Sequence, residues 1–558
     1  MKPFFMLAIC MAFSVPLFAQ PKAEIVVLNA KIWTMDADHP QAQAMACADG
    51  RILEVGQDPQ MQRYIGPSTR VLRLQGKRVL PGFIDNHVHF VSGGFQLLGL
   101  DLRPARTPDE FIRLIRDRAE KNPGAWVTGG DWDHENWPDA PLPRKEWIDA
   151  VTAQTPVFVA RFDGHMGLAN SLALRLAGIT RNTADPAGGE IVRDPSTGEP
   201  TGILKDEAMT VVYQLVPDAT AQEREQAALA ALNEAKKYGV TSLQDLSSAE
   251  DVAVYQKLRQ TGLLTARINC RLPISEIDAV LRTGISSGLG DEWIRIGGLK
   301  AFADGSLGSS TALFYQPYEQ DPNTYGLASD VLLDGRLEKW ILSADRHRLQ
   351  VSTHAIGDSA NGRVLDFYAQ CAQNNEPSDR RHRIEHAQHL APADLSRFAE
   401  LGVIAAVHPY HLIDDGRWAA KRIGQARCRQ AYPIRSLLDH GAKVSFGTDW
   451  TVAPLNPLWG LYAAVTRRTL DGKNPDGWIP EQKITLPEAI RCYTVNSAFC
   501  TYEEHIKGCL KPGYLADWVV LSEDIINLDP VRLWDVKVEM TVVGGKVVYA
   551  MQSEETGR

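Results

Sequence analysis

The stretch Leu80–His89, which reads LPGFIDNHVH, decides the fold of this chain. It is a short apolar run that ends in two histidines one residue apart, which is typical of a strand buried on both faces. Seven later runs share the pattern of an apolar strand with a polar residue near its end. These are GVTSLQDL (239–246), ARINCRL (266–272), IRIGGLKAF (294–302), QVSTH (350–354), RRHRIEH (380–386), GVIAAVHP (402–409) and AKVSFGTDW (442–450).

Helical patterns separate these runs, and the alternation predicts a parallel βα architecture. Residues 220–239 (TAQEREQAALAALNEAKKYG) precede the second run, and residues 392–402 (PADLSRFAELG) precede the seventh. Eight such units are the number that a (β/α)₈ TIM barrel requires. We therefore predict an α/β protein with a barrel over residues 81–504.

The segment between the first two runs is much longer than a normal crossover connection. It contains another strand-like run, TPVFVARFDGH (155–165), and a stretch dense in Trp, Pro and charge, GGDWDHENWPDAPLPR (129–144). We expect residues from about 95 to 230 to form an insertion over the barrel mouth, with the Trp-rich stretch as a lid or pocket wall.

Both ends of the chain have the texture of short antiparallel strands. Residues 20–80 contain EIVVLNAKIWTM, AMACADGRILEVG and TRVLRLQGKRVL, which are rich in Val and Ile, are broken by glycine and predict β-hairpins. Residues 505–558 contain ADWVVLSED and VEMTVVGGKVVYA. The two ends are expected to meet in one small β-sandwich.

Residues 1–19 predict an export signal, because one early lysine precedes an apolar run that is too short to span a bilayer. We therefore expect a periplasmic or secreted protein that is free of the membrane after cleavage. Removal of Cys10 leaves seven scattered cysteines without CxxC spacing, which we expect to be mostly buried free thiols. A net charge of −9 and a pI near 5.9 argue against nucleic-acid binding.

Histidines and an aspartate lie at the ends of the predicted strands. Residues i and i+2 of a strand share a face, so His87 and His89 both point into the barrel. His354, His386 and Asp449 end the fifth, sixth and eighth strands, at the rim where barrel active sites lie. Imidazoles with a carboxylate suit Zn²⁺, and they also accept Fe²⁺, Mn²⁺ or Ni²⁺. The pattern predicts a metal centre.

At this point the sequence resembles the metal-dependent amidohydrolase superfamily, in particular its amidohydrolase-3 branch of N-substituted formamide deformylase-like proteins. The resemblance covers nearly the whole chain after the signal. It is carried by LNAKIWTMD, PGFIDNHVHF, RFDGHMGLANS, GVTSLQD, KAFADGSLGSSTA, HAIGD, RIEHAQ, GTDW, NPLWGLYAAVTR and KPGYLADWVVL. It implies the same barrel with a β-sandwich built from both termini.

The resemblance also implies a role for Lys300, at the end of the fourth strand. In binuclear relatives this lysine reacts with CO₂, and the resulting carbamate bridges two metals. Lys300 paired with Asp304 or another acid is the alternative. The implied ligand sets are His87, His89, Lys300 and Asp449 for one ion, and Lys300, His354 and His386 for the other.

The implied mechanism uses hydroxide activated by the metal, with Asp449 as general base and then general acid. His165 resembles the family histidine that faces the substrate as an oxyanion donor, or it caps a loop of the lid. Asp304, Trp450 and His408 complete the expected substrate-binding residues. His408 ends the seventh strand where many relatives carry glutamine, and we expect it to contact substrate rather than a metal. His382, His389, His411 and His440 are expected to pack nearby or to support the ligands from behind.

Relatives often carry arginine where this chain has Ser310 and Ser359. The loss of two cations near the barrel mouth would weaken recognition of a substrate carboxylate or phosphate. The predicted substrate is therefore a small neutral or aromatic amide or N-substituted formamide, and the predicted partner is a second copy of the chain at most. A cyclic amidase, a deaminase and an esterase of the same superfamily remain alternatives. A non-catalytic binding protein is disfavoured because no expected ligand position is missing.

Overall fold

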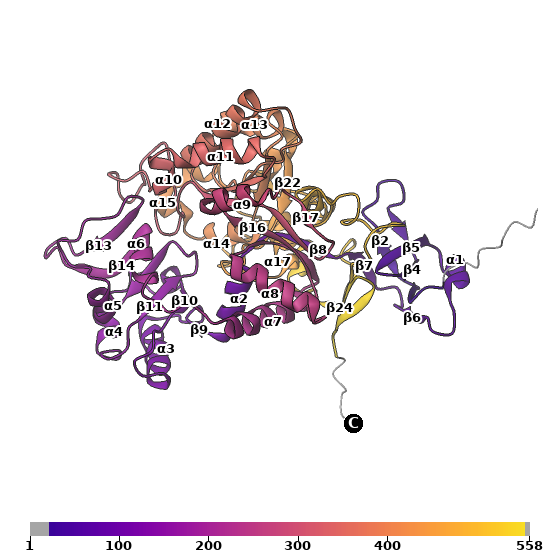
Figure 1. Ribbon diagram of the computed structural model, residues 1–558, viewed down its shortest axis with the longest axis horizontal. Helices are drawn as coiled ribbons and strands as arrows, with labels where there is room; N and C mark the ends of the chain where they lie inside the picture. The colour runs from indigo at the N-terminus through magenta and orange to yellow at the C-terminus, as the bar shows by residue number, and fades with distance from the viewer. Residues whose placement is uncertain (1–21, 553–558) are drawn as a thin grey trace, which may run out of the picture.

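The computed structural model describes residues 22–552. Its centre is a parallel barrel that holds the eight predicted strands in sequence order, which confirms the predicted fold (Figure 1). The barrel strands are β8 (Phe83–Val88), β15 (Val240–Leu246), β16 (Arg267–Pro273), β18 (Ile294–Phe302), β19 (Val351–Ala355), β20 (Arg383–His386), β21 (Ile404–Val407) and β22 (Lys443–Phe446).

The barrel closes at its carboxyl-terminal rim. Strands β22 and β8 share no regular ladder, and a single bridge joins Val88 to Trp450. Two backbone hydrogen bonds complete the closure: the Asp449 amide donates to the His87 carbonyl at 2.8 Å, and the His89 amide donates to the Trp450 carbonyl at 2.6 Å. The joint therefore lies among the predicted metal ligands.

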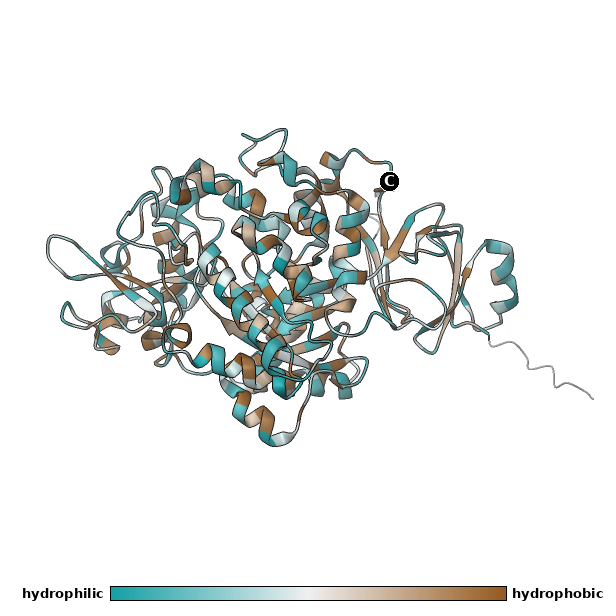
Figure 2. Cartoon of the chain, turned by 90° about the horizontal axis from the view of Figure 1, so that it is seen from above, coloured by the Kyte–Doolittle hydropathy of each residue, from teal (hydrophilic) through white to brown (hydrophobic). Residues whose placement is uncertain are grey.

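Helices surround the barrel and pack hydrophobic side chains against the strands in one core. Brown stretches along the helices and strands in Figure 2 mark these hydrophobic residues. The longer ones are α2 (Phe90–Leu98), α7 (Ala221–Lys237), α8 (Ala249–Gln260), α11 (Arg336–Arg346), α12 (Asp358–Asn374), α15 (Ala419–Cys428), α17 (Pro457–Thr466) and α18 (Leu486–Tyr493). The shorter ones are α9 (Ile277–Thr283), α10 (Asp330–Leu333), α13 (Leu395–Glu400), α14 (Pro409–Asp415), α16 (Ile434–Asp439) and α19 (Val495–Phe499).

The segment between β8 and β15 folds into a separate six-stranded sheet, hereafter the inserted sheet, at the left of Figure 1. In sheet order its strands are β13 (Gly189–Arg193), β14 (Pro200–Asp206), β12 (Met166–Ala169), β11 (Phe158–Arg161), β10 (Gly129–Trp132) and β9 (Leu100–Asp101). Its helices are α3 (Pro108–Lys121), α4 (Lys145–Asp149), α5 (Ser171–Leu176) and α6 (Glu207–Tyr213).

Two expectations about this segment need correction. The boundary predicted near residue 230 falls inside α7, which packs so closely on α2 that a Cβ on Gly94 would lie 1.9 Å from the Ala227 carbonyl oxygen. Helix α7 is therefore part of the barrel. Trp132 and Trp137 do not form a pocket wall, since both are buried in the core of the inserted sheet beside Phe111. Large aromatic rings are better used to hold this small sheet together.

The two ends of the chain pack as a sandwich at the opposite end of the molecule (Figure 1). One sheet holds β5 (Arg51–Gly56), β4 (Ala44–Ala48), β1 (Ile25–Leu28) and β6 (Arg70–Arg73). The other holds β25 (Lys546–Ala550), β24 (Val538–Val543), β23 (Trp518–Leu521), β7 (Arg78–Pro81), β2 (Lys31–Trp33) and β3 (Gln41–Ala42).

Only one of the three hairpins predicted near the start of the chain is formed. Strands β4 and β5 pair across Asp49-Gly50, whereas β1 and β2, and likewise β6 and β7, lie in different sheets. The short linkers after β1 and β6 carry the chain from one sheet to the other, which buries Val and Ile from both sheets in a shared core.

Residues 1–21, which include the predicted signal and Cys10, lie outside the described residues. Within the described part of the chain, the seven cysteines are free thiols and six of them are buried, as predicted. None of the helices between residues 22 and 552 has the length and apolar character needed to cross a bilayer.

Candidate active site

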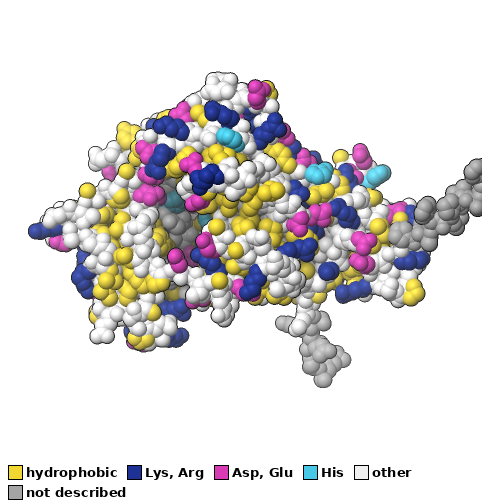
Figure 3. Space-filling model, in the orientation of Figure 1, with side chains coloured by type: hydrophobic (Ala, Val, Ile, Leu, Met, Phe, Trp, Pro, Cys, Tyr) yellow, Lys and Arg dark blue, Asp and Glu magenta, His cyan; other side chains and the backbone are white. Residues whose placement is uncertain are grey.

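The carboxyl-terminal rim of the barrel brings the predicted metal ligands together around one cavity of about 1110 Å³. The hollow between the inserted sheet and the barrel is visible in Figure 3. Because parallel strands all end at this rim, each strand contributes a side chain to the same space. The cavity is lined by His87, His89, Lys300, His354, His386 and Asp449, and also by His165.

Asp449 lies at the centre of the histidines. Its Oδ1 atom is 3.4 Å from Nε2 of His87 and 3.5 Å from Nε2 of His89, and its Oδ2 atom is 4.0 Å from Nδ1 of His386. Asp449 has a positive φ of 56° in the loop after β22, a strained conformation that aims its carboxylate at the rim. Several ligating atoms therefore face one carboxylate.

Lys300 is buried on β18 and lies next to this group. Its Nζ is 3.4 Å from Nε2 of His87 and 4.2 Å from the centre of the Phe302 ring. Among the described residues no carboxylate lies within ion-pair distance of Lys300, so the alternative of a pair with Asp304 is wrong. Burial lowers the pKa of Lys300 to about 8, which gives it a larger fraction of neutral amine than an ordinary lysine has.

A buried polar layer that the sequence did not reveal orients His87. Nδ1 of His87 lies 2.5 Å from a Glu385 carboxylate oxygen, and Arg383 donates to that same oxygen at 2.9 Å. Arg383 and Glu385 are both fully buried, and their i, i+2 spacing on β20 turns them to the barrel interior. The spacing in RRHRIEH was the only available signal for this pair. A carboxylate behind a histidine fixes its tautomer and leaves Nε2 free to bind metal.

The imidazoles at the rim are held in their neutral form. Burial lowers the pKa of His87 to about 4, and it moves the pKa values of His354 and His386 well below the ordinary value. Neutral imidazole and ionised carboxylate are the forms that bind metal. Although burial acts against ionisation of Asp449, the neighbouring histidines keep its pKa well below the usual range.

The donor atoms fit a divalent cation. Among the described residues, several buried atoms at this rim have no hydrogen-bond partner: Nδ1 of His386, Oδ1 of Asp449, both ring nitrogens of His408 and Nε2 of His411. Buried polar atoms normally find a partner, and unpaired lone pairs that converge are best satisfied by a cation. One ligating atom each from His87, His386, His408 and Asp449 lies within 4.8 Å of the other three.

His165 projects from the inserted sheet toward the metal ligands. Its ring centre is 5.1 Å from that of His354, and its Nδ1 lies 2.6 Å from a carboxylate oxygen of Asp206. Burial acts to lower the pKa of His165, but Asp206 outweighs that effect and the pKa is raised. Asp206, which the sequence did not single out, thus orients His165 so that Nε2 faces away from the carboxylate.

Three residues expected to bind substrate do not line the main cavity. Trp450 closes the barrel through its backbone, and its ring packs on Phe90 and Gly93 of α2. Asp304 accepts backbone hydrogen bonds from Leu313, Ile356 and Gly357, which leaves it a loop-fixing role. His408 is fully buried behind the cavity lining.

The four histidines expected to pack or to support the ligands differ in position. His411 lines the cavity with Nε2 3.9 Å from Oδ2 of Asp449, so it lies beside a predicted ligand, as a supporting residue would. His389 and His440 each contact a backbone carbonyl. His382 lies with Asp345 and Cys371 in a second group of candidate ligands, but Nε2 of His382 and Nε of Arg380 both contact the Asp345 carboxylate. The charge of the Asp345 carboxylate is therefore already neutralised by these two partners.

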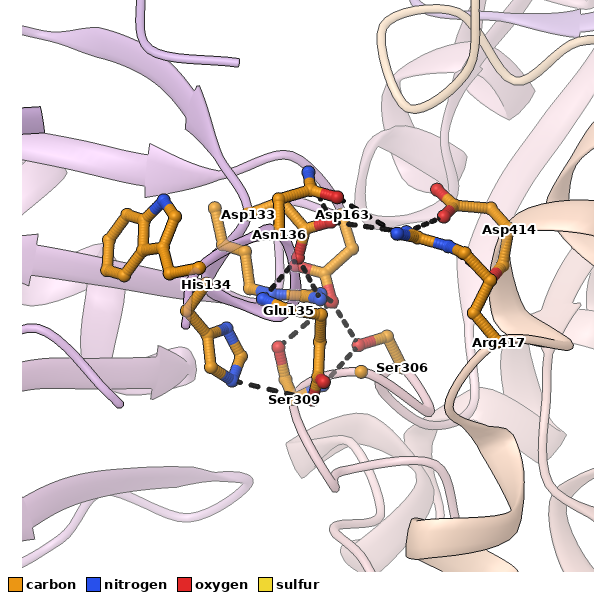
Figure 4. A network of polar contacts seen from close by, with 12 residues as sticks. Asp133, His134, Glu135, Asn136, Asp163, Ser306, Ser309, Asp414 and Arg417 are labelled. Atoms are coloured by element: carbon orange, nitrogen blue, oxygen red, sulfur yellow. Dashed lines mark hydrogen bonds and ion pairs between the residues drawn. The ribbon is translucent and has the colours of Figure 1, made fainter. Parts of the chain in front are cut away.

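A polar network fixes the inserted sheet to the barrel (Figure 4). Arg161, fully buried on β11, donates to Asp163 at 2.5 Å and to Asp133 at 3.2 Å. Asp163 accepts from Ser306 and Ser309 in the loop after β18 at 2.6 and 3.0 Å. The insert therefore forms a fixed roof over the site, and Arg161 is neutralised by its partners.

A barrel with histidines, a lysine and an aspartate at its carboxyl-terminal rim defines a metal-dependent hydrolase. The amidohydrolase family pattern matches residues 70–549, so this chain belongs to the amidohydrolase family and acts on C–N bonds. Over 94% of its length it is 40% identical to the protein LONG AFTER FAR-RED 3 of Arabidopsis thaliana, of which 92% is covered.

Two further proteins are similar over nearly the whole chain. The N-substituted formamide deformylase of Arthrobacter pascens is 27% identical, with 96% of this chain and 99% of that protein covered. The crystal structure of an uncharacterized metal-dependent hydrolase from Pyrococcus horikoshii OT3 superimposes with a TM-score of 0.74 at 25% identity. The superposition covers 91% of this chain and 99% of the Pyrococcus protein.

Glu385→Gln is expected to weaken metal binding by about 10–100-fold, because the neutral amide no longer holds His87 in its metal-binding tautomer. Metal competition with a chelator of known affinity, followed by elemental analysis, measures the change. Glu400→Gln, at the exposed end of α13, is the control. Unchanged metal affinity in the Glu385 variant would contradict an orienting role.

Asp206→Asn is expected to lower kcat at least about tenfold and to leave the metal content unchanged. The substitution removes the negative charge that orients His165 and raises its pKa, so His165 becomes a weaker hydrogen-bond donor. Steady-state kinetics on any amide that the enzyme cleaves would separate kcat from KM. Asp185→Asn, exposed on the same inserted segment, is the control. A change in KM alone would show that the Asp206–His165 pair serves binding only.

Proposed function

We propose that this amidohydrolase cleaves linear amides or N-substituted formamides into an amine and an acid. The observation that carries the proposal is the convergence of His87, His89, His354, His386 and Asp449 on one cavity with unpaired ligating atoms. The similarity to a formamide deformylase along nearly the whole chain supports this substrate class over a deaminase or a cyclic amidase. Because residues 1–19 have the pattern of an export signal, we place the enzyme in the periplasm or outside the cell.

The histidines and Asp449 would hold one or two divalent cations, for which Zn²⁺ is the best match to the nitrogen and oxygen donors. Such a cation supplies Lewis-acid activation of water and of the scissile carbonyl. Asp449 accepts the proton of the attacking water and delivers it to the leaving nitrogen. His165, which the inserted sheet brings beside His354, donates a hydrogen bond to the carbonyl oxygen as negative charge develops there.

We further propose that Lys300 carries a carbamate that bridges two cations. Its neutral amine would add to CO₂ with loss of one proton and become an anion with two oxygen ligands. Support comes from its burial beside His87 without a carboxylate partner, since an ammonium there would be costly next to metal cations.

The charge of the cavity favours neutral over anionic substrates. Its acidic lining residues are Asp131, Asp163, Asp218, Glu223, Asp414, Asp415 and Asp449. Its basic residues are Arg118, Arg161 and Lys300. Ser310 and Ser359 do not line the cavity. Arginines at these two positions would not contact a substrate there, so their absence does not support a neutral substrate. The acidic lining supports a neutral substrate on other grounds: away from the metal ligands, Asp131, Asp218, Glu223 and Asp414 would repel a carboxylate on the distal part of the substrate.

A panel of N-formyl and N-acyl aromatic amines is expected to yield amine plus acid without free ammonia when the protein is loaded with Zn²⁺. Analogues that differ only by a carboxylate on the ring are expected to have a kcat/KM lower by about tenfold or more, since repulsion of about 1.4 kcal/mol gives that factor. Chromatography of the amine and an ammonia assay measure both outcomes.

Chelation followed by addition of the metal is the control for this panel, and it should abolish and then restore turnover. Release of ammonia instead of an amine would replace this proposal with deamination. Turnover that survives complete metal removal would contradict the metal-dependent mechanism altogether.

Lys300→Ala is expected to bind one metal ion fewer than the wild type and to lose most activity, because the bridging anion is gone. Elemental analysis of protein prepared in bicarbonate gives the stoichiometry, with the exposed Lys257→Ala as a control. A Lys300→Ala protein with two ions and full activity would rule out the bridge.

A further inference from the structure

We propose that His408 is a metal ligand, a role that adds the seventh strand to the metal centre. His408 directly follows β21 (Ile404–Val407) and forms the N-cap of α14. The inference rests on the metal dependence of the family and on the rim geometry, and it does not depend on which amide is the substrate.

Both ring nitrogens of His408 are buried, and neither has a hydrogen-bond partner among the described residues. The side chain is only 1% exposed, so bulk water cannot satisfy it. A neutral imidazole presents one N–H and one lone pair, and to bury both without partners costs free energy. Such a group in a native protein needs an explanation.

Two buried histidines outside the ligand group each have a partner. His382, at the amino-terminal end of β20, contacts a carboxylate, and His389, in the loop after β20, contacts a backbone carbonyl. His408 instead contacts other candidate ligands: its ring centre lies 4.8 Å from that of His87 and 4.7 Å from that of His386. One ring nitrogen of His389 thus has a partner, whereas neither nitrogen of His408 has one among the described residues.

The ligating atoms of this group can share one ion. One atom each from His87, His386, His408 and Asp449 falls within 4.8 Å of the others, and all four side chains are buried. Three imidazoles and one carboxylate are a donor set suited to a four-coordinate Zn²⁺. Because His408 does not line the cavity, substrate cannot reach it, whereas an ion held by His87, His386 and Asp449 would lie next to it.

This assignment leaves donors for a second ion. His87, His386, His408 and Asp449 would hold one ion, whereas His89 and His354, on the same cavity, stay available to the second. Oδ1 of Asp449 also lies 3.5 Å from Nε2 of His89, so Asp449 links the two positions. A carbamate on Lys300, beside His87, would supply the anion between the two ions.

The test is metal affinity, measured without substrate. His408→Gln and His408→Ala are expected to bind one ion at least about 100-fold more weakly than the wild type, more than the loss typical of an outer partner. The visible absorption spectrum of the Co²⁺-loaded protein should also change, because one nitrogen ligand is lost. His389→Gln, a buried histidine outside the ligand group, should keep both the affinity and the spectrum.

Equal melting temperatures of the metal-free proteins would show that the substitutions leave the fold intact. If either variant fails to fold, the anomalous scattering of wild-type crystals loaded with Zn²⁺ decides. An ion about 2.0–2.1 Å from a nitrogen of His408 supports the proposal, and an ion bound only by the other residues overturns it. Unchanged affinity and Co²⁺ spectrum in both His408 variants would overturn it equally. These metal-binding measurements do not depend on whether any compound of the amide panel is cleaved.

Discussion

The structure depends on how the barrel closes. Between β22 and β8 the ladder is replaced by one bridge and two backbone hydrogen bonds, from Asp449 to His87 and from His89 to Trp450. Three predicted ligands, His87, His89 and Asp449, therefore close the fold and also face the candidate metal site. Any change that opens this joint would separate the ligands, so fold and chemistry share one constraint.

Buried polar groups behind the rim orient the predicted ligands that lie at this joint. Arg383 and Glu385 occupy barrel-interior positions that would otherwise be apolar, and they fix His87 through a charge-assisted hydrogen bond. Burial keeps the imidazoles neutral, which is the form that a metal requires. The cost of burying so many polar atoms is offset only when a cation and the Arg383–Glu385 pair satisfy them.

The inserted sheet supplies what the barrel lacks. It brings His165, oriented by Asp206, over the metal ligands, and the network around Arg161 and Asp163 holds it in place. The sequence predicted an insert at this position but assigned its tryptophans to the cavity. Hydrophobicity alone does not distinguish a pocket wall from the core of a small sheet, since both bury aromatic rings.

The sequence by itself determined the barrel, its eight strands, the side chains that meet at the rim and the sandwich of the two chain ends. Strand periodicity and chain order are local properties, and parallel strands necessarily end at one rim. Only the tertiary structure decided the partners of Asp304, Trp450, Asp206, Glu385 and His408. These residues are far apart in the sequence, and their roles depend on which groups share a buried space and which atoms remain unpaired there. That information arises when the chain packs, because desolvation acts on the assembled environment and not on the residue type.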